Sequence, residues 1–243
     1  MALSLSPMNI IEFKNTIVEP HSMVETTGID MLFRICEKVI VNNIEGDFVE
    51  TGVWEGGLSA IFLRKIIKNN LNKKLYLYDT FEGMPEPTVI DVKTTKEVGF
   101  RAHREWINTK DGKFSDWCRA SLDTVKDTLS QVTLDYEKHT FFIKGKVEDT
   151  LLDSKNLPDK ISVLRLDTDW YTSTKIEMEV LYPKVVKNGY IIIDDYYHWR
   201  GCKKAVDEYL KSLPRNSYGK TKYYDKALVI KKLAIQGEND GTN

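Results

Sequence analysis

Short apolar runs alternate with longer amphipathic segments along most of this 243-residue chain. The runs are rich in Ile, Val, Leu and Tyr and are bounded by turn residues, which is typical of strands buried on both faces of a parallel sheet. They predict five strands, over residues 47–52, 74–79, 139–144, 161–167 and 190–195. Because segments with helical spacing separate these strands, the pattern predicts an α/β fold with a mostly parallel sheet.

The intervening segments repeat their apolar residues at the spacing of amphipathic helices. They predict helices over residues 28–41, 58–67, 121–132, 172–186 and about 200–213. Ser121 is a candidate N-cap of the third of these, and Gly189 is read as the stop of the fourth. Two more strands, 222–224 and 227–230, are joined so tightly that they should be antiparallel. The sheet should therefore have seven strands and end in an antiparallel hairpin.

One segment breaks the strand and helix alternation. Residues 84–119 form an insertion that is too long for an ordinary connection, and we interpret it as a lid that shapes substrate choice. Residues 1–26 are expected to be an N-terminal arm that packs over the domain or over a neighbouring subunit. The polar tail 236–243 is expected to be disordered. We therefore expect a single domain over residues 1–235.

Composition excludes several classes of partner and compartment. The formal net charge of −1 gives no support for a nucleic-acid or acidic-membrane partner. Three scattered cysteines, Cys36, Cys118 and Cys202, form neither a disulfide framework nor a zinc spacing, which suits a reducing compartment. The N-terminus has no basic segment typical of a secretory signal, and no apolar run approaches the ~20 residues of a membrane span. These features favour a cytoplasmic protein.

Carboxylates end two of the predicted strands. Asp167 and Asp169 follow one strand, and Asp194 and Asp195 follow another. Ligands bind at the carboxyl edge of open α/β sheets, and clustered carboxylates there call for a cation or a shared proton. A hard, oxygen-binding ion such as Mg²⁺ is the natural candidate. The alternative is that these residues cap the helices that follow.

The first predicted strand runs into a glycine-bearing turn, residues 51–57, at the start of a helix. Such a turn lets a ligand approach the backbone closely. The second strand ends at Asp79, and an acid at that place commonly accepts hydrogen bonds from the ribose hydroxyls of a nucleoside cofactor. Helix capping is again the alternative role for Asp79.

A nucleotide-type fold of this kind allows a dehydrogenase interpretation. Residues 51–56 partly match the Thr-Gly-rich turn of NAD(P)-dependent short-chain dehydrogenases, and Tyr171 and Lys175 have the spacing of their catalytic pair. Against it, Leu58 stands where that turn has its last glycine, and this spacing arises easily in a chain with 12 tyrosines. A non-catalytic binding protein on the same fold is a third interpretation, but it would have little reason to keep so many like charges together.

Four ordered motifs carry a specific resemblance, at residues 46–57, 78–85, 164–174 and 181–196. Over about residues 24–210 the chain closely resembles the TylF/macrocin-type O-methyltransferases, which methylate sugar hydroxyls on natural products. The resemblance implies a class I methyltransferase with a Rossmann-like fold that uses S-adenosylmethionine and Mg²⁺, often as an oligomer. Two positions depart from the family pattern: Glu55 stands where Arg is usual, and Thr168 where Gly is usual.

The resemblance also implies site residues. Asp167, Asp194 and Asp195 would be the metal ligands, and Glu50, Gly52 and Asp79 would line the cofactor site. The full set expected to bind the cofactor lies at strand ends and helix starts: Glu50, Thr51, Gly52, Val53, Trp54, Gly56, Ser59, Asp79, Thr80, Ser121, Gly145, Val147 and Asp167.

The expected reaction is methyl transfer to a hydroxyl of a sugar, as a glycan, a glycoside or a nucleotide sugar. A sugar hydroxyl is a very weak acid, so a divalent ion bound to it would help its proton to leave. Asp169 is the first candidate for general base, and His198 is the second because imidazole titrates near neutrality. Asp167 would be catalytic as a metal ligand. The enzyme is expected to form a homodimer.

Overall fold

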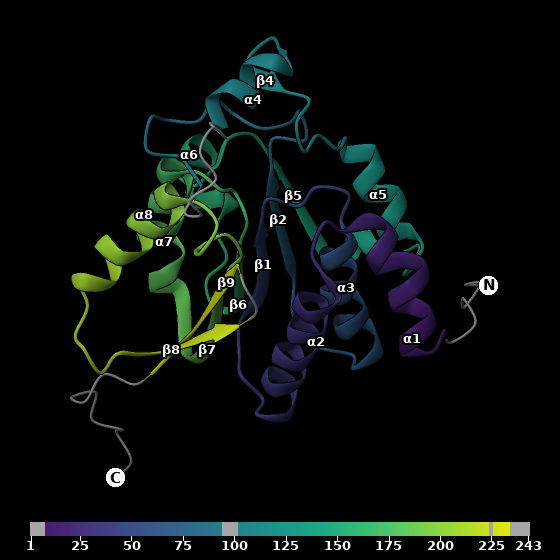
Figure 1. Ribbon diagram of the computed structural model, residues 1–243. Helices are drawn as coiled ribbons and strands as arrows, with labels where there is room; N and C mark the ends of the chain where they lie inside the picture. The colour runs from purple at the N-terminus through teal and green to yellow at the C-terminus, as the bar shows by residue number, and fades with distance from the viewer. Residues whose placement is uncertain (1–7, 94–101, 224–225, 234–243) are drawn as a thin grey trace.

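A seven-stranded sheet forms the centre of the computed structural model, which describes residues 8–93, 102–223 and 226–233 (Figure 1). The strand order is β5-β2-β1-β6-β7-β9-β8. Contacts among the first five strands of that order are parallel, while β9 is antiparallel to β7 and to β8. The strands are β1 Asp47–Thr51, β2 Leu75–Asp79, β5 Thr140–Lys144, β6 Ile161–Leu166, β7 Val185–Ile193, β8 Tyr218–Tyr223 and β9 Ala227–Lys232. The predicted sheet and its terminal antiparallel hairpin are confirmed.

Helices cover both faces of this sheet. The longer ones are α2 Thr26–Val41, α3 Gly57–Lys68, α5 Leu122–Ser130, α7 Tyr171–Val180 and α8 Arg200–Lys211, and the shorter ones are α1 Ile10–Phe13, α4 Ala102–Asn108 and α6 Val147–Thr150. Figure 1 shows α2, α3 and α5 on one side of the sheet and α6, α7 and α8 on the other. Each face has its own apolar core, because the inner strands alternate their buried side chains between the two faces.

The sheet brings five strand ends to one edge. β1 lies between β2 and β6, so the strand order reverses there, and ligands bind at such a reversal in open α/β sheets. Thr51 pairs with Tyr78 of β2 and with Leu166 of β6, and Leu166 pairs with Ile193 of β7. The residues that follow these strands therefore lie next to one another.

The helix predicted over 172–186 is shorter than expected. α7 ends at Val180, a 3₁₀ turn over Tyr182–Lys184 contains Pro183, and β7 begins at Val185. The prediction of Gly189 as a helix stop is wrong, because Gly189 lies inside β7. A Cβ on Gly189 would be 2.7 Å from Cγ1 of Val185, and the preceding Asn188 has a φ of +66°. Gly189 thus marks an irregularity in the strand, opposite a register shift in β6.

The described part of the N-terminal arm, residues 8–25, packs on the α2 and α3 face. It contains α1, a π-helical turn over Lys14–Val18 and a 3₁₀ turn over Glu19–His21. Phe13, Ile17 and Val18 are buried in the core of that face. The arm also contacts the start of α3, where a Cβ on Gly57 would lie 2.4 Å from the carbonyl oxygen of His21. The tail predicted to be disordered, 236–243, lies outside the described residues.

The insertion is tied to the fold at its first residues. The indole N–H groups of Trp106 and Trp170 donate to the carbonyl oxygens of Met84 and Pro85, each at 3.0 Å. The short strands β3 Lys110–Asp111 and β4 Phe114–Ser115 form a hairpin beside α4, at the top of the molecule in Figure 1. None of the helices in the described part of the chain is long and apolar enough to cross a membrane.

Candidate active site

A cavity of about 370 Å³ opens at the carboxyl edge of the sheet. Its wall combines residues that follow β1, β2, β5, β6 and β7 with residues of the insertion and the arm. Met84, Pro85 and Trp117 of the insertion and Met23 and Val24 of the arm supply apolar surface. The volume and the mixed wall are typical of a small-molecule site.

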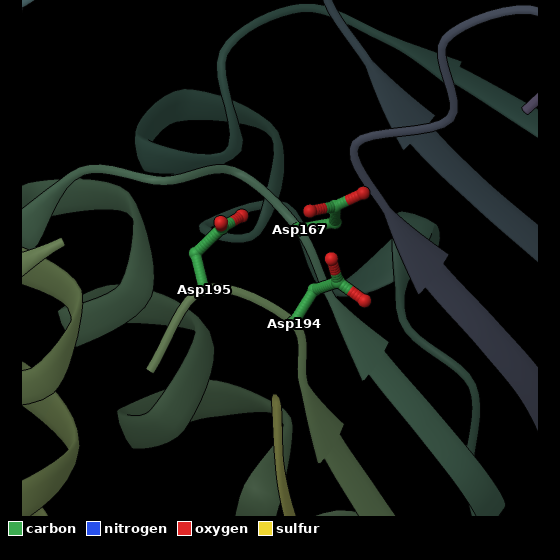
Figure 2. Close-up of side chains that lie close together, drawn as sticks. All are labelled: Asp167, Asp194 and Asp195. Carbon is green, nitrogen blue, oxygen red and sulfur yellow. The ribbon is translucent and has the colours of Figure 1, made fainter. Parts of the chain in front are cut away.

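Three carboxylates from two adjacent strands meet in this cavity. Asp167 follows β6, Asp194 and Asp195 follow β7, and one oxygen from each lies within 4.8 Å of the others (Figure 2). Parallel pairing of β6 and β7 places the two strand ends side by side, which accounts for the convergence predicted from the sequence. We call these three residues the carboxylate trio.

Arg165 of β6 lies beneath the carboxylate trio and was not predicted as a site residue. Its guanidinium contacts Glu50 of β1 at 2.9 Å, Asp167 at 2.6 Å and Asp194 at 3.2 Å, and its side chain is 4% exposed. The only signal in the sequence is a charged residue inside a strand whose other residues are mostly apolar. Such a residue must find buried partners of opposite charge.

The positive charge of Arg165 does not offset the burial and mutual repulsion of the carboxylates in the trio. Burial raises the pKa of Asp167 well above its usual value; Arg165 lowers that pKa, and the charges of Asp194 and Asp195 raise it. Burial, followed by the charge of Asp169, likewise raises the pKa of Asp195. Clustered hard oxygen donors that repel one another fit a divalent cation of the Mg²⁺ type.

Asp169 and His198, the two candidate bases, both line the cavity. A side-chain hydrogen bond joins Asp169 to Asp195, and burial is the main cause that raises the pKa of Asp169 to about 7. Asp169 also has a φ of +67°, a left-handed conformation that costs free energy for a non-glycine residue. The ring of His198 packs edge-to-face on Trp199, with ring centroids 4.8 Å apart.

The alternative role of these acids as helix caps is wrong for the helices that follow. The N-cap of α7 is Trp170 and that of α8 is Trp199, and neither N-cap makes a side-chain capping bond. The first amide of α7, at Tyr171, instead donates to Oδ1 of Asp91 in the insertion at 2.8 Å. The strand-end acids are therefore available to the cavity.

The glycine-bearing turn approaches the trio closely. Gly52 has a φ of +75°, and a Cβ there would lie 2.0 Å from the carbonyl oxygen of Asp167. Oδ2 of Asp79 accepts from the amides of Val53 at 2.7 Å and Trp54 at 3.3 Å. Asp79 therefore fixes the turn in addition to lining the cavity.

The predicted cofactor residues fall into two groups. Those that line the cavity are Gly52, Trp54, Asp79, Thr80, Gly145, Val147 and Asp167. Those outside the lining, among the described residues, are Glu50, Thr51, Val53, Gly56, Ser59 and Ser121.

The second group supports the first. Glu50, Thr51 and Ser59 are buried, and Glu50 accepts hydrogen bonds from Ser59 and from Arg165. Ser121 is the N-cap of α5, as predicted, and its hydroxyl accepts from the amide of Thr124 at 3.1 Å. In this structure, therefore, Glu50 anchors Arg165 below the cavity and is not part of the cavity wall.

The candidate dehydrogenase pair lies elsewhere. The hydroxyl of Tyr171 donates to Glu208 at 2.7 Å, and Lys175 lies 4.0 Å from Glu179 on the surface of α7. Neither residue belongs to the cavity lining. The spacing match therefore has no counterpart in the site.

Known proteins share both the sequence and the fold. Residues 16–215 match the family described as Macrocin-O-methyltransferase (TylF). Demethyldecarbamoylnovobiocin O-methyltransferase of Streptomyces niveus is 32% identical over 192 residues, which are 78% of this chain and 67% of that protein. The 8-demethyl-8-(2,3-dimethoxy-alpha-L-rhamnosyl)-tetracenomycin-C 4'-O-methyltransferase of Streptomyces olivaceus is 31% identical over 201 residues, 82% of this chain and 69% of that protein.

The solved structure of the O-methyltransferase NovP has a TM-score of 0.71 and 29% sequence identity, and the match covers 88% of this chain and 83% of that one. The strand order and the terminal hairpin agree with the class I methyltransferase fold implied by the resemblance. Because the family match spans most of the chain, the dehydrogenase and non-catalytic interpretations are set aside. The chain belongs to the TylF macrocin O-methyltransferase family and is an O-methyltransferase.

Proposed function

We propose that this enzyme transfers the methyl group of S-adenosylmethionine to a hydroxyl of a sugar, in a site that binds Mg²⁺. The observation that carries the proposal is the carboxylate trio, which opens into the same cavity as the glycine-bearing turn. The carboxylate trio would hold the metal and residues of the glycine-bearing turn would hold the cofactor, in a cavity that the insertion also lines.

The acceptor class is proposed from the relatives. One is named for 4'-O-methylation of a tetracenomycin that bears a rhamnosyl group, and another for O-methylation of demethyldecarbamoylnovobiocin. The part of the wall that comes from the insertion is apolar and aromatic, with Met84, Pro85 and Trp117. A glycoside or deoxysugar, which has apolar faces as well as hydroxyls, suits such a wall.

The cofactor residues have distinct proposed tasks. The absence of a side chain at Gly52 lets the turn lie directly against the carbonyl oxygen of Asp167, so the turn and the carboxylate trio face the same cavity. Asp79 lies at the end of β2, where an acid commonly accepts hydrogen bonds from ribose hydroxyls. Its bonds to Val53 and Trp54 hold the turn ready for the cofactor.

Methyl transfer forms a bond between the hydroxyl oxygen and the methyl carbon, breaks the bond from that carbon to sulfur, and releases the hydroxyl proton. Mg²⁺ held by Asp167, Asp194 and Asp195 would supply acidification of the acceptor hydroxyl. Asp169 accepts the proton at its carboxylate, because it lines the cavity next to Asp195. His198 is the second candidate for this role.

Calorimetric titration of the purified protein tests the cofactor. We expect S-adenosylmethionine to bind with a Kd in the micromolar range and NAD(H) to show no binding, because the Tyr171 and Lys175 pair lies outside the cavity lining. Methyl transfer to a panel of glycosides should stop in EDTA and return when Mg²⁺ is added in excess. Binding of NAD(H) in place of S-adenosylmethionine, or full activity in EDTA, would contradict the proposal.

A further inference from the structure

A buried carboxyl group lies behind the trio and has no part in the proposed chemistry. Glu177 of α7 is fully buried, and its Oε1 accepts a hydrogen bond from the hydroxyl of Thr168 at 2.9 Å. The side chain of Thr51 also lowers the pKa of Glu177, while the Thr51 hydroxyl donates to the carbonyl oxygen of Arg165 at 3.5 Å. Within the described part of the chain its other oxygen, Oε2, has no hydrogen-bond partner.

Such a group is costly to bury. An unpaired polar atom in the interior loses its bonds to water without replacement. Burial is the main cause that raises the pKa of Glu177 to about 8, so the side chain is mostly a neutral carboxylic acid at pH 7. Glu177 therefore weakens the fold unless its contacts with Thr168 and Thr51 contribute something else.

Thr51 and Thr168 belong to two different parts of the site, the end of β1 before the glycine-bearing turn and the segment after β6 that carries Asp167. Thr51 ends β1 immediately before Gly52, and Thr168 stands between Asp167 and Asp169. The two segments already touch, because the amide of Asp167 donates to the carbonyl oxygen of Thr51 at 2.9 Å. Glu177 adds a side-chain bridge behind this junction.

Thr168 is held on both its backbone and its side chain. Its carbonyl oxygen accepts from the amide of Trp170 at 2.7 Å and from the hydroxyl of Ser173 at 3.2 Å. Its hydroxyl is bound to Glu177. The next residue, Asp169, keeps a left-handed φ of +67°, a conformation that persists only when its surroundings fix it.

We propose that Glu177 is a positioning residue, which acts through Thr168 to fix the segment 167–169 and with it the carboxylates of Asp167 and Asp169. The inference rests on the proposed function, because it gives those two carboxylates their tasks as metal ligand and base.

The burial of Glu177 predicts how the stability of the folded protein changes with pH. Since folding raises the pKa of Glu177 from its usual 4.5 to about 8, the folded state binds this proton more tightly, and the contribution of Glu177 to stability falls as pH rises between those values. Glu148, Asp167 and Cys202 are its titratable neighbours. Glu177→Gln removes the titration. The urea midpoint of this variant minus that of wild type should therefore increase from pH 5 to pH 8. An unchanged difference would show that Glu177 does not titrate in this range.

The positioning role itself is tested with a matched pair of variants at position 168. Thr168→Val keeps the shape of the side chain but loses the hydroxyl, whereas Thr168→Ser keeps the hydroxyl. Mn²⁺ affinity, measured by calorimetry, needs no acceptor; groups that orient metal ligands typically change it 10- to 100-fold. We expect Thr168→Val to weaken Mn²⁺ binding by roughly tenfold and Thr168→Ser to stay within about twofold of wild type.

The same variants should separate kcat from KM. With the glycoside that reacts fastest, Thr168→Val should lower kcat by roughly tenfold with little change in the KM for S-adenosylmethionine, because the base is misplaced. Glu177→Leu should match Thr168→Val, and Glu177→Gln should stay close to wild type. The double variant Thr168→Val/Glu177→Leu should be no worse than either single variant.

The outcomes separate this inference from the function on which it rests. If wild type binds Mn²⁺ and methylates a glycoside while Thr168→Val behaves as Thr168→Ser in both assays, the positioning role is overturned and the proposed function stands. If wild type binds neither Mn²⁺ nor S-adenosylmethionine, the proposed function fails and the inference fails with it. If Glu177→Leu does not fold, the comparison of Thr168→Val with Thr168→Ser still tests the positioning role.

Discussion

Asp167→Asn is expected to lower the rate of methyl transfer by about a thousandfold and to remove measurable Mn²⁺ binding. Asp167 supplies one of the three oxygens that lie within 4.8 Å of one another, and amide oxygens are weaker ligands than carboxylates. A bound cation contributes several kcal/mol of transition-state stabilisation, and about 1.36 kcal/mol corresponds to each tenfold in rate. The rate at saturating Mg²⁺ and a calorimetric Mn²⁺ titration measure the two effects.

Asp149→Asn is the matched control for this substitution. Asp149 lies on α6 near the cavity, but it is exposed and is not part of the cavity lining. Both variants lose one negative charge, so a general charge effect on the enzyme would appear in both. A near-normal rate for Asp167→Asn at low Mg²⁺ would show that the carboxylate trio is not a metal centre.

The convergence of the trio could be predicted because it depends only on topology. Apolar runs identify parallel strands, and the carboxyl ends of adjacent parallel strands lie at one edge. The sequence alone therefore indicated that Asp167, Asp194 and Asp195 would meet. The glycine turn and Asp79 follow from the same reasoning, since β1 is the neighbour of β6 and β2 is the next strand beyond β1.

The supports of the site could not be predicted, because they depend on side chains that meet from distant positions. Arg165 contacts Glu50 across 115 positions of sequence, and Asp91 reaches the start of α7 across 80. Local pattern contains no information on such pairs. For the same reason Glu50 was expected in the cavity wall, whereas its carboxylate faces Arg165 and Ser59 below it.

The end of α7 was misplaced for a different reason. Residues 181–186 keep an apolar spacing that a helix would also produce, and periodicity over a short run does not separate helix from strand. Pro183 removes an amide donor, and the β-branched Val185 and Val186 favour the strand. Pairing of β7 with β6 and β9, which the local sequence does not reveal, determines that the chain is a strand from Val185 onward.

Gly52→Ala is expected to destabilise the protein by about 3 kcal/mol or more and to weaken binding of both Mn²⁺ and S-adenosylmethionine. The left-handed φ of +75° costs about 1–2 kcal/mol for a residue with a Cβ. The added Cβ would also lie 2.0 Å from the carbonyl oxygen of Asp167, and such overpacking typically costs about 1–3 kcal/mol more. Urea unfolding measures the first effect and calorimetry the second.

Gly112→Ala separates these two costs. Gly112 has a similar φ of +61°, but a Cβ there meets no atom within 4 Å. Its substitution should therefore cost only the backbone strain of about 1–2 kcal/mol, and the difference between the two variants measures the collision with Asp167. If the two variants lose the same stability and Gly52→Ala keeps its ligand affinities, the turn and the segment after β6 can move apart freely. The close contact between them would then not be what holds the glycine-bearing turn against the carboxylate trio.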